Sequence, residues 1–318
     1  MSAGYLGPVK KSAAVTRKPR PVGNLPKVGI IGAGRLGCAL AGNLSVLGYR
    51  VAVSDVNPRH ARSAYRLTRR PYRRLSSGDV ALASDVLFLT VPDNSIKPVF
   101  DAVKPFLRRG ALVVHCSGAM GARVFGPLRG PGIEVLALHP VQSFASTRQA
   151  ACSLSGSWFA IDGTPAGLRF GRALVRRMQG RCVMVRLEQR PLYHAMCVFG
   201  SNFVSALLDA GQSIADELGI SHRDSLAMLV SLARSVIDNA SELGVEASLT
   251  GPVERGDAET VDKHLEALDR SAPELVRLYR AASLHLVAMA RRKGLAPASA
   301  RRLRAMLNRN LQTTDEHR

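Results

Sequence analysis

The segment from residue 27 to residue 57 constrains the fold of this chain more than any other. It begins with a short apolar run, Val28 to Ile31, and continues with a turn in the pattern G-x-G-x-x-G: Gly32, Gly34 and Gly37. Leucines at helical spacing follow the turn, and a second apolar run ends at Asp55. A strand, a glycine turn, a helix and an acid-terminated strand in this order are typical of a dinucleotide-binding βαβ unit. This context disfavours the alternative, a glycine-rich turn that binds nothing.

Each glycine of this turn has its own expected role. Gly32 permits the tight turn, Gly34 lets a pyrophosphate approach the backbone, and Gly37 lets the helix pack closely against the sheet. The N-terminus of the helix would offer free N–H groups and the positive end of its dipole to the phosphates. We therefore expect NAD or NADP to contact these residues: Gly32, Ala33, Gly34, Arg35, Leu36, Gly37, Asp55, Arg59, Val91, Pro92 and Asp93.

Asp55 favours NAD over NADP, because a carboxylate accepts hydrogen bonds from the ribose hydroxyls and repels a 2′-phosphate. Arg59 and Arg62 follow closely in the sequence and could instead bind that phosphate. The prediction is therefore NAD, by a narrow margin.

Length and cysteine usage narrow the class of protein. A chain of 318 residues suggests two domains, and no apolar run reaches the roughly 18 residues of a membrane span. The basic N-terminus lacks the apolar core of a secretory signal. The five cysteines are odd in number and form no C-x-x-C pair: Cys38, Cys116, Cys152, Cys182 and Cys197. They favour a reducing cytosol and argue against a disulfide framework or a structural metal site.

The formal net charge of +20 raises the possibility of a nucleic-acid partner. Basic residues cluster in three blocks, at residues 10–20, 59–74 and 291–304. Aromatic residues form only 5% of the chain and do not interleave with these blocks, so stacking platforms for bases are not evident. Solvated basic faces are the favoured interpretation. We expect weak, salt-dependent adhesion to polyanions and no specific nucleic-acid partner.

The chain divides into three parts. Residues 1–25 have the composition of a disordered basic tail. Residues 26–186 alternate apolar strands with helical segments, which predicts a Rossmann domain with a doubly wound, mainly parallel sheet. The expected strands are Val28–Ile31, Val51–Val53, Val86–Val91, Leu112–His115, Val135–Leu138, Trp158–Ile161 and Cys182–Val185. Residues 187–318 show only helical spacing, so the C-terminal domain should be all-helical, for substrate binding and dimerisation.

Polar side chains follow three of the expected strands, where an open α/β sheet binds its ligands. Pro92-Asp93 and Ser117-Gly118 could equally be turns stabilised by their own side chains, and those alternatives remain open. His139 directly follows the strand Val135–Leu138. Imidazole is the usual acid or base near neutral pH, so His139 is the favoured acid/base, although a structural histidine would sit there too.

Seven motifs together resemble a known family. They are the fingerprint of residues 32–37, LTVPDNSI (89–96), HCSGA (115–119), LHPVQSFA (138–145), YHAMCVFGSN (193–202), LTGPVERGD (249–257) and TVDKHLEAL (260–268). The chain is similar to proteins that join a Rossmann domain to a helical C-terminal domain of unknown function, within the 6-phosphogluconate dehydrogenase-like superfamily. The resemblance implies an oxidoreductase related to ketopantoate reductase, pyrroline-5-carboxylate reductase and prephenate dehydrogenase.

The resemblance also implies roles for individual residues. Prephenate-type dehydrogenases carry a serine and a His-Pro after successive strands, and Ser117 and His139 stand in that order here. Ketopantoate-type enzymes use a Lys-x-x-x-Asn helix. Asn202 suits the asparagine position, but Val198 replaces the lysine, which puts the ketopantoate mechanism in doubt. His194 could reach the same cleft as Asn202 from an earlier turn of the helix.

The loop Thr250–Asp257 interrupts the helical half. Arg255 could bind a substrate carboxylate in a two-pronged contact, with Thr250 and Asp257 beside it. Equally, Asp257 and a nearby threonine could simply cap the next helix. The Arg-Gly-Asp triplet within this loop is set aside as an adhesion signal, because that role needs an extracellular surface.

These features predict a cytosolic NAD(P)-dependent oxidoreductase that acts on a small carbonyl or hydroxy acid, with ketopantoate reductase as one possible relative in activity. Catalysis would rest on His139, Ser117, Asn202 and His194. We also expect a symmetric homodimer formed through residues of about 195–290. A non-catalytic NAD(P)-sensing or scaffold protein is the alternative, and a basic nucleic-acid-associated protein is a second one.

Overall fold

The computed structural model describes residues 25–126, 132–146 and 154–309. The basic tail and Cys152 lie outside these ranges. The described residues fall into two compact units that divide between Ser201 and Asn202, and each is described by itself. The sheet unit is residues 25–201, and the helical unit is residues 202–309.

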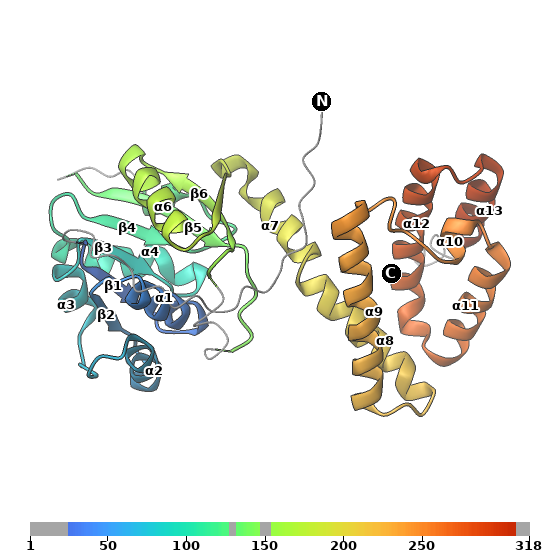
Figure 1. Ribbon diagram of the computed structural model, residues 1–318, viewed down its shortest axis with the longest axis horizontal. Helices are drawn as coiled ribbons and strands as arrows, with labels where there is room; N and C mark the ends of the chain where they lie inside the picture. The colour runs from blue at the N-terminus through green and yellow to red at the C-terminus, as the bar shows by residue number, and fades with distance from the viewer. Residues whose placement is uncertain (1–24, 127–131, 147–153, 310–318) are drawn as a thin grey trace, which may run out of the picture. The chain divides into compact units, whose positions relative to one another are not determined.

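Among the described residues, seven strands form one sheet in the order β2-β1-β3-β4-β5-β6-β7 (Figure 1). They are β1 (Val28–Ile31), β2 (Val51–Ser54), β3 (Val86–Leu89), β4 (Leu112–His115), β5 (Glu134–Pro140), β6 (Trp158–Gly163) and β7 (Arg181–Met184). Every neighbouring pair is parallel except β5 and β6, which are antiparallel. The expected doubly wound, mainly parallel sheet is confirmed.

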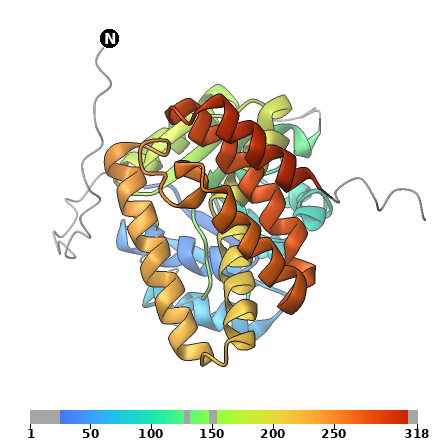
Figure 2. The same ribbon diagram turned by 90° about the vertical axis from the view of Figure 1, so that its right-hand side faces the viewer.

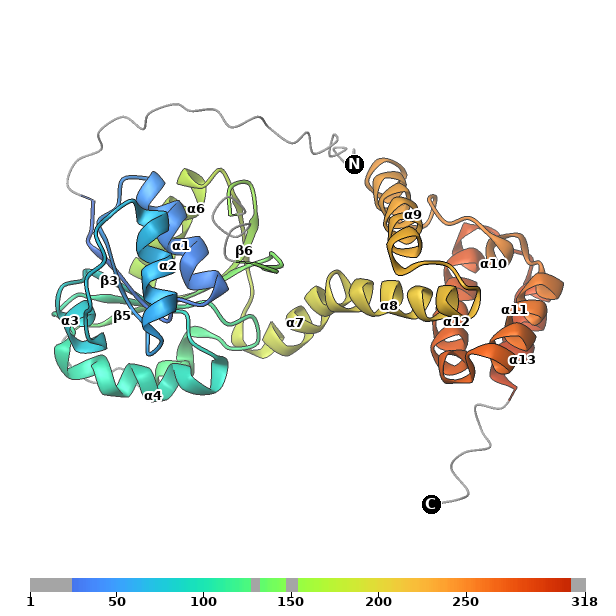
Figure 3. The same cartoon turned by 90° about the horizontal axis from the view of Figure 1, so that it is seen from below.

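Helices cover both faces of this sheet. The helices are α1 (Arg35–Val46), α2 (Pro58–Thr68), α3 (Ser77–Leu82), α4 (Asp93–Val103), α6 (Pro165–Arg177) and α7 (Arg190–Phe199), with 3₁₀ turns η1 (Lys104–Phe106), η2 (Ala122–Phe125) and η3 (Leu187–Gln189). One buried cluster joins the sheet to Leu40 of α1, Tyr65 of α2 and Leu174 of α6. A second joins the opposite face to α3, α4 and η2. Figure 3 shows α1 and α2 on one side of the strands and α4 on the other.

Capping residues in the sequence fix where two of these helices begin. The side chain of Asn57 accepts a hydrogen bond from the N–H of Arg59, and Pro58 occupies the first turn of α2. Ser76 and Asp79 form a reciprocal capping box at the start of α3. These caps satisfy N–H groups that have no partner inside the helix.

Five strands have bounds that differ from the expected ones: β2, β3, β5, β6 and β7. Two of these differences concern predicted site residues. β3 ends at Leu89, before Val91. β5 is longer than expected and includes His139 and Pro140, so the expectation that His139 follows the strand was wrong. The reason is the antiparallel partner β6, which pairs Ala160 with His139 and extends the ladder beyond Leu138. The backbone of His139 is therefore held by a strand and not by a loop.

The described helical unit contains no strand, which confirms the expected fold of the C-terminal half. Its helices are α8 (Asn202–Glu217), α9 (His222–Leu243), α10 (Pro252–Arg255), α11 (Ala258–Ser271), α12 (Val276–Lys293) and α13 (Pro297–Asn308). Helices α10 to α13 enclose one apolar core around Val261, Val287 and Leu303, and they gather into one bundle in Figure 2. Helices α8 and α9 pack against each other.

Large apolar side chains are exposed on α8 and α9. They include Leu207, Met228, Leu232, Val236 and Ile237, each more than half exposed. A helical stretch that includes α7 and α8, Leu187–Glu217, is also long and apolar enough to cross a membrane by length and composition, contrary to the expectation from sequence. It is weak evidence for a span, because core helices of soluble proteins pass the same test.

Candidate functional site

The carboxyl ends of β1, β3, β4 and β5 lie at one edge of the sheet unit, because these strands run parallel. The glycine loop, Gly32–Gly37, follows β1 at this edge. Asp93 follows β3, Ser117 follows β4, and His139 lies near the end of β5. Open α/β sheets bind ligands at this edge. The predicted site residues of the sheet unit therefore lie where a ligand could contact them.

The glycine loop has the geometry expected of a phosphate-binding turn. Gly32 has a φ of +96°, which residues with side chains rarely adopt. A Cβ atom on Gly37 would lie 2.0 Å from the carbonyl oxygen of Gly32, so only glycine allows this approach of helix and strand. A Cβ atom on Gly34, by contrast, would meet no described atom within 4 Å. The fold thus requires Gly32 and Gly37, whereas Gly34 borders open space.

The N-terminus of α1 beside this space suits an anionic group. No side chain caps the helix at Gly34, and its first turn contains no acid. Amide N–H groups at such a terminus bind phosphate, with the helix dipole favouring negative charge. The side chain of Arg35 donates to the carbonyl oxygen of Phe144 at 3.4 Å. These residues therefore fit a dinucleotide whose pyrophosphate lies against Gly34 and the start of α1.

Thr90 and Val91 support the glycine loop from the end of β3. The hydroxyl of Thr90 donates to the carbonyl oxygen of Gly32. A Cβ atom on Gly32 would lie 3.0 Å from Cγ1 of Val91, so Val91 lies beside the loop, as expected of a cofactor contact. Sequence reasoning missed Thr90. Its signal was available, since it is a hydroxyl residue directly after a buried strand.

Asp55 joins the end of β2 to the glycine loop. One carboxylate oxygen accepts the N–H of Ala33, and the other accepts the N–H of Asn57 at 2.7 Å. Its side chain is 8% exposed, and Nδ1 of His60 lies 3.6 Å away. A carboxylate has about four acceptor positions, so ribose hydroxyls could still bind there. Arg59 is exposed at the start of α2, close to this carboxylate in sequence.

Ser117 and Asp93 are hydrogen-bonded to each other. The Ser117 hydroxyl donates to Oδ2 of Asp93 at 2.7 Å and accepts the N–H groups of Ala119 and Met120 at 3.2 and 3.1 Å. The turn that was the alternative to a chemical role for Ser117 is therefore present. Because its single hydrogen points to Asp93, this hydroxyl anchors the loop after β4 to the start of α4.

His139 of β5 is hydrogen-bonded to a tyrosine of α7. Its Nδ1 lies 2.7 Å from the hydroxyl of Tyr193 on α7, and the two rings meet edge to face. Burial, followed by the charges of His194 and Arg190, lowers the pKa of His139 to about 4. The imidazole is therefore uncharged at neutral pH and can accept a proton. Tyr193 was quoted within a motif, but its contact with His139 was not anticipated.

His194 lies one residue beyond Tyr193 on α7. The centroid of its ring is 6.3 Å from that of His139. Its side chain is exposed, whereas that of His139 is partly buried. The structure thus brings both histidines predicted from sequence into one cluster.

Arg190 is a buried cation that sequence reasoning missed. It is fully buried, its Nε donates to the carbonyl oxygen of Val185 at 3.3 Å, and its Nη1 donates to that of Ser117 at 3.5 Å. Its Nη2 has no hydrogen-bond partner among the described residues. Arg190 ties the start of α7 to the loop after β4, and it adds a positive charge near His139. No spacing in the sequence distinguishes it from the other arginines of this basic chain.

His115 is the other buried histidine of this region. Its Nε2 lies 3.1 Å from the carbonyl oxygen of Gly121, and its Nδ1 accepts the N–H of Ser117 at 3.3 Å. Burial lowers the pKa of His115 to about 4. With both nitrogens bonded to backbone, this histidine shapes the loop after β4.

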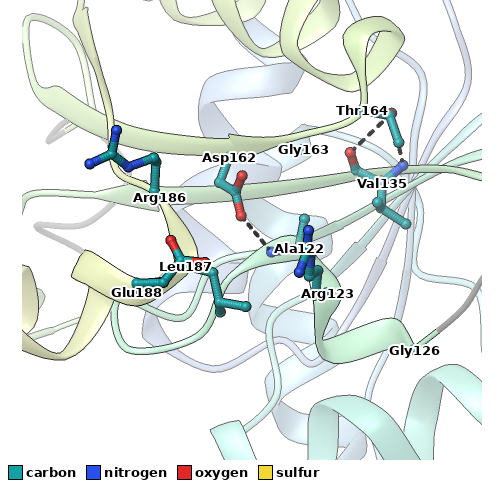
Figure 4. Close-up of a pocket in the computed structure, with 10 residues that line it drawn as sticks. All are labelled: Ala122, Arg123, Gly126, Val135, Asp162, Gly163, Thr164, Arg186, Leu187 and Glu188. Carbon is teal, nitrogen blue, oxygen red and sulfur yellow. Dashed lines mark hydrogen bonds between the residues drawn. The ribbon is translucent and has the colours of Figure 1, made fainter.

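A pocket of about 710 Å³ lies elsewhere on the sheet unit, between η2, the end of β6 and η3 (Figure 4). It is lined by Ala122, Arg123, Gly126, Val135, Asp162, Gly163, Thr164, Arg186, Leu187 and Glu188. Asp162 accepts the N–H of Ala122 at its wall. None of the residues expected to bind cofactor or substrate lines this pocket.

The remaining predicted site residues belong to the helical unit. Asn202 is the first residue of α8. Asp257 caps α11, with Oδ1 accepting the N–H of Thr260 at 3.0 Å and Oδ2 its hydroxyl at 2.7 Å. The capping alternative for Asp257 is therefore present. Arg255 and Thr250 are exposed on the same loop, where Arg255 remains available to an anionic ligand.

The described cysteines are free thiols: Cys38, Cys116, Cys182 and Cys197. Burial raises the pKa of Cys38 to about 11 and that of Cys116 to about 12, so neither is a thiolate at neutral pH. Across residues 25–126, 132–146 and 154–309, no group of three or more possible metal ligands occurs.

Comparisons with known proteins agree with this fold. Residues 14–140 match a Rossmann-like domain, and residues 157–286 match a domain of unknown function, DUF2520. Comparison with curated proteins gave no match.

Solved structures of similar fold align with most of the chain. A Bacteroides fragilis protein, provisionally described as an NADP oxidoreductase, is 22% identical with a TM-score of 0.69, over 81% of this chain and 96% of that one. A Thermotoga maritima protein is 24% identical with a TM-score of 0.64, over 84% and 99%. A pyrroline-5-carboxylate reductase from Coxiella burnetii is 16% identical with a TM-score of 0.56, over 89% and 99%. At these identities the likeness shows the fold. The chain therefore contains a Rossmann-like domain followed by the domain of unknown function DUF2520.

Proposed function

We propose that this protein is an NAD(P)-dependent oxidoreductase that interconverts a hydroxyl and a carbonyl group on a small acid. The observation that carries the proposal is the shared sheet edge. A glycine loop with open space at Gly34 and an uncharged imidazole, His139, lie at the carboxyl ends of strands of one mainly parallel sheet. Hydride transfer to or from a carbon that bears oxygen needs these two things, a bound dinucleotide and a group that handles one proton.

The glycine loop and Asp55 would hold the dinucleotide. The N–H groups at the start of α1 would bind the pyrophosphate against Gly34, and Asp55 would accept the ribose hydroxyls, with Val91, Pro92 and Asp93 along the same edge. When bound, the nicotinamide supplies the hydride acceptor or donor. NAD is the favoured form because of Asp55, with Arg59 as the residue that could favour NADP.

His139 would hold the proton of the reacting hydroxyl at Nε2, since Nδ1 is bonded to Tyr193. Ser117 would act by anchoring the loop beside it, because its hydroxyl is bonded to Asp93. Asn202 and His194 are proposed to bind the substrate oxygen, and Arg255, with Thr250 and Asp257 beside it, to bind a carboxylate. The pyrroline-5-carboxylate reductase of similar fold is named for a small carboxylate substrate, which supports the acid part of the proposed substrate and not its reacting group.

A two-step experiment tests the proposed function. Thermal unfolding is measured with NAD, NADH, NADP and NADPH, and one of them should raise the melting temperature, since a ligand of the folded state stabilises it. Turnover is then measured with hydroxy acids and keto acids. Stabilisation without turnover of any substrate would favour a dinucleotide-sensing or scaffold protein. Salt-dependent binding of nucleic acid that dinucleotide leaves unchanged would favour the basic nucleic-acid-associated protein.

We also propose a symmetric homodimer formed through residues of about 195–290. The support is the apolar surface of α8 and α9, where Leu207, Leu232 and Val236 are 54%, 66% and 54% exposed. Light scattering at micromolar concentration tests it. A mass near 34.1 kDa, the value for one chain, would contradict the dimer and leave Arg255 to act only within its own chain.

We further propose a cytosolic location. The support is cysteine usage, since the described cysteines are free and thiols persist in a reducing compartment. Fractionation of cells that express the chain tests the proposal, and recovery of the protein with membranes at high salt would contradict it.

A further inference from the structure

Two imidazole nitrogens approach the same point above Gly118. A Cβ atom on Gly118 would lie 2.9 Å from Nε2 of His139 and 2.7 Å from Nδ1 of His194. These nitrogens come from different elements, β5 and α7. The position has room for both rings only because residue 118 has no side chain.

The other nitrogen of His139 is held in place. Its Nδ1 lies 2.7 Å from the hydroxyl of Tyr193, which is buried and also hydrogen-bonds Cys197. Burial raises the pKa of Tyr193, so the phenol keeps its hydrogen at neutral pH. When that hydrogen points to Cys197, the Tyr193 oxygen accepts from Nδ1–H, and Nε2 of neutral His139 is then an acceptor.

We propose that His139 and His194 bind one substrate oxygen between them above Gly118 and share a single proton, which selects alcohols over amines. This inference rests on the proposed function and adds how the reacting oxygen is bound and which analogues the site refuses. A hydroxyl group suits the pair because it donates one hydrogen bond and accepts another. A protonated amine has only donors, so it would leave one imidazole without a complementary partner.

The reaction balances with a bound oxidised dinucleotide as the only co-reactant. The alcohol donates its O–H to Nε2 of His139 and accepts a hydrogen bond from Nδ1–H of His194. With a bound nicotinamide to take the hydride from the carbon, the O–H bond would break, its proton would remain on Nε2 of His139, and the C=O double bond would form. Tyr193 accepts from Nδ1–H of His139 before and after this step, so their hydrogen bond survives the transfer.

The charges around His139 limit the pair to one proton. His194 and the buried Arg190 oppose a positive charge on it, as does His115, whereas Asp93 favours that charge. Burial, the largest influence, also lowers the pKa of His139. His139 is thus uncharged at neutral pH, with Nε2 free to accept a hydrogen bond, and its surroundings oppose protonation of both rings at once.

Nuclear magnetic resonance of protein labelled with ¹⁵N in histidine tests the pair without any substrate. Signals of His139 are identified by their loss in His139→Asn. At neutral pH they should show the Nδ1–H tautomer, and in His194→Gln the titration midpoint of His139 should move upward, because a like charge is removed. An Nε2–H tautomer, or the same midpoint in parent and His194→Gln, would overturn the proposal.

Alanine substitutions of two glycines, Gly118 and Gly200, provide a test variant and its matched control. Gly118→Ala should shift the ring signals of both histidines, since the new methyl would overlap both. Gly200→Ala should leave them unchanged, because a Cβ there meets only the carbonyl oxygen of Cys197, at 3.8 Å. If Gly118→Ala leaves either histidine unmoved, the two rings do not converge on this point. Should it fail to fold, the comparison of the parent with His194→Gln still decides.

Assays with dinucleotides and with a panel of substrates distinguish failure of this inference from failure of the proposed function. Absence of stabilisation by any dinucleotide refutes the proposed function but leaves the coupling of the histidines measurable. With oxidised dinucleotide, the parent should oxidise hydroxy acids and not the corresponding amino acids. Turnover of amino acids alone would overturn the substrate class while upholding the oxidoreductase.

Discussion

The glycine loop and the histidine pair are found at one edge of the same sheet, but they are built differently. The loop is made of backbone from one βαβ unit, and its conformation follows from where glycine allows a positive φ or a close approach. The pair is made of side chains that β4, β5 and α7 bring together. A site built from local backbone leaves a spacing in the sequence, whereas one built from distant side chains depends on packing. The following experiments test whether dinucleotide binding by the loop and proton transfer by the histidine pair can be changed independently.

The largest expected effect is on turnover. His139→Asn should lower turnover by roughly 10²–10⁴, because it removes the group that takes the proton in the transition state. Dinucleotide affinity, measured by titration, should stay at the parent value, since the glycine loop does not involve His139. Near-normal turnover would transfer the role to His194. Loss of folding would instead make His139 a structural residue.

Acid should destabilise the protein through buried His115. Its pKa is about 4 in the folded protein and about 6.5 when unfolded, so as pH falls below 6.5 the unfolded state binds a proton first. Stability is therefore lost between pH 6.5 and 4, by about 3 kcal/mol at roughly 1.4 kcal/mol per pKa unit. Urea unfolding across this range should show a steeper loss in the parent than in His115→Gln. Equal pH dependence in the two proteins would mean that His115 is protonated, or exposed, in the folded state.

Gly34→Val should separate binding from stability. The new side chain has open space in the protein alone, so the variant should unfold at the parent temperature without ligand. It should lose the stabilisation by dinucleotide, about 2.7 kcal/mol at a concentration of 100 Kd, because it occupies the position of the pyrophosphate. Gly37→Ala is the contrasting control, since its Cβ would overlap Gly32 and destabilise the fold itself. A Gly34→Val protein that binds as the parent does would place the nucleotide elsewhere.

The smallest expected effect is the preference between dinucleotides. NAD should bind more tightly than NADP by less than about tenfold, or 1.4 kcal/mol, because Asp55 and Arg59 act in opposite directions. Arg59→Ala should weaken NADP and leave NAD unchanged in parallel titrations. A tenfold tighter NADP would show that the arginines of α2 outweigh Asp55.

Much of the sheet unit could be predicted from its sequence. β1 and β4 begin and end at the expected residues, because short apolar runs bounded by glycine, proline or polar residues mark buried strands. The roles of Gly32 and Gly37 were also readable, since each is a local demand on backbone conformation. The extent of β5 was not, because its last residues join the strand only through pairing with β6.

The sequence by itself determined the Rossmann sheet, the helical second half and the place of the glycine loop. These features depend on hydrophobic period and backbone conformation, which neighbouring residues impose. Only the tertiary structure decided that Ser117 bonds Asp93, that Tyr193 holds His139, and that Arg190 is a buried cation. Those contacts join residues far apart in the chain, and the burial that changes their chemistry arises when β4, β5 and α7 pack together. The sequence identifies the histidines, but burial in the packed structure sets the protonation state of His139 and His115.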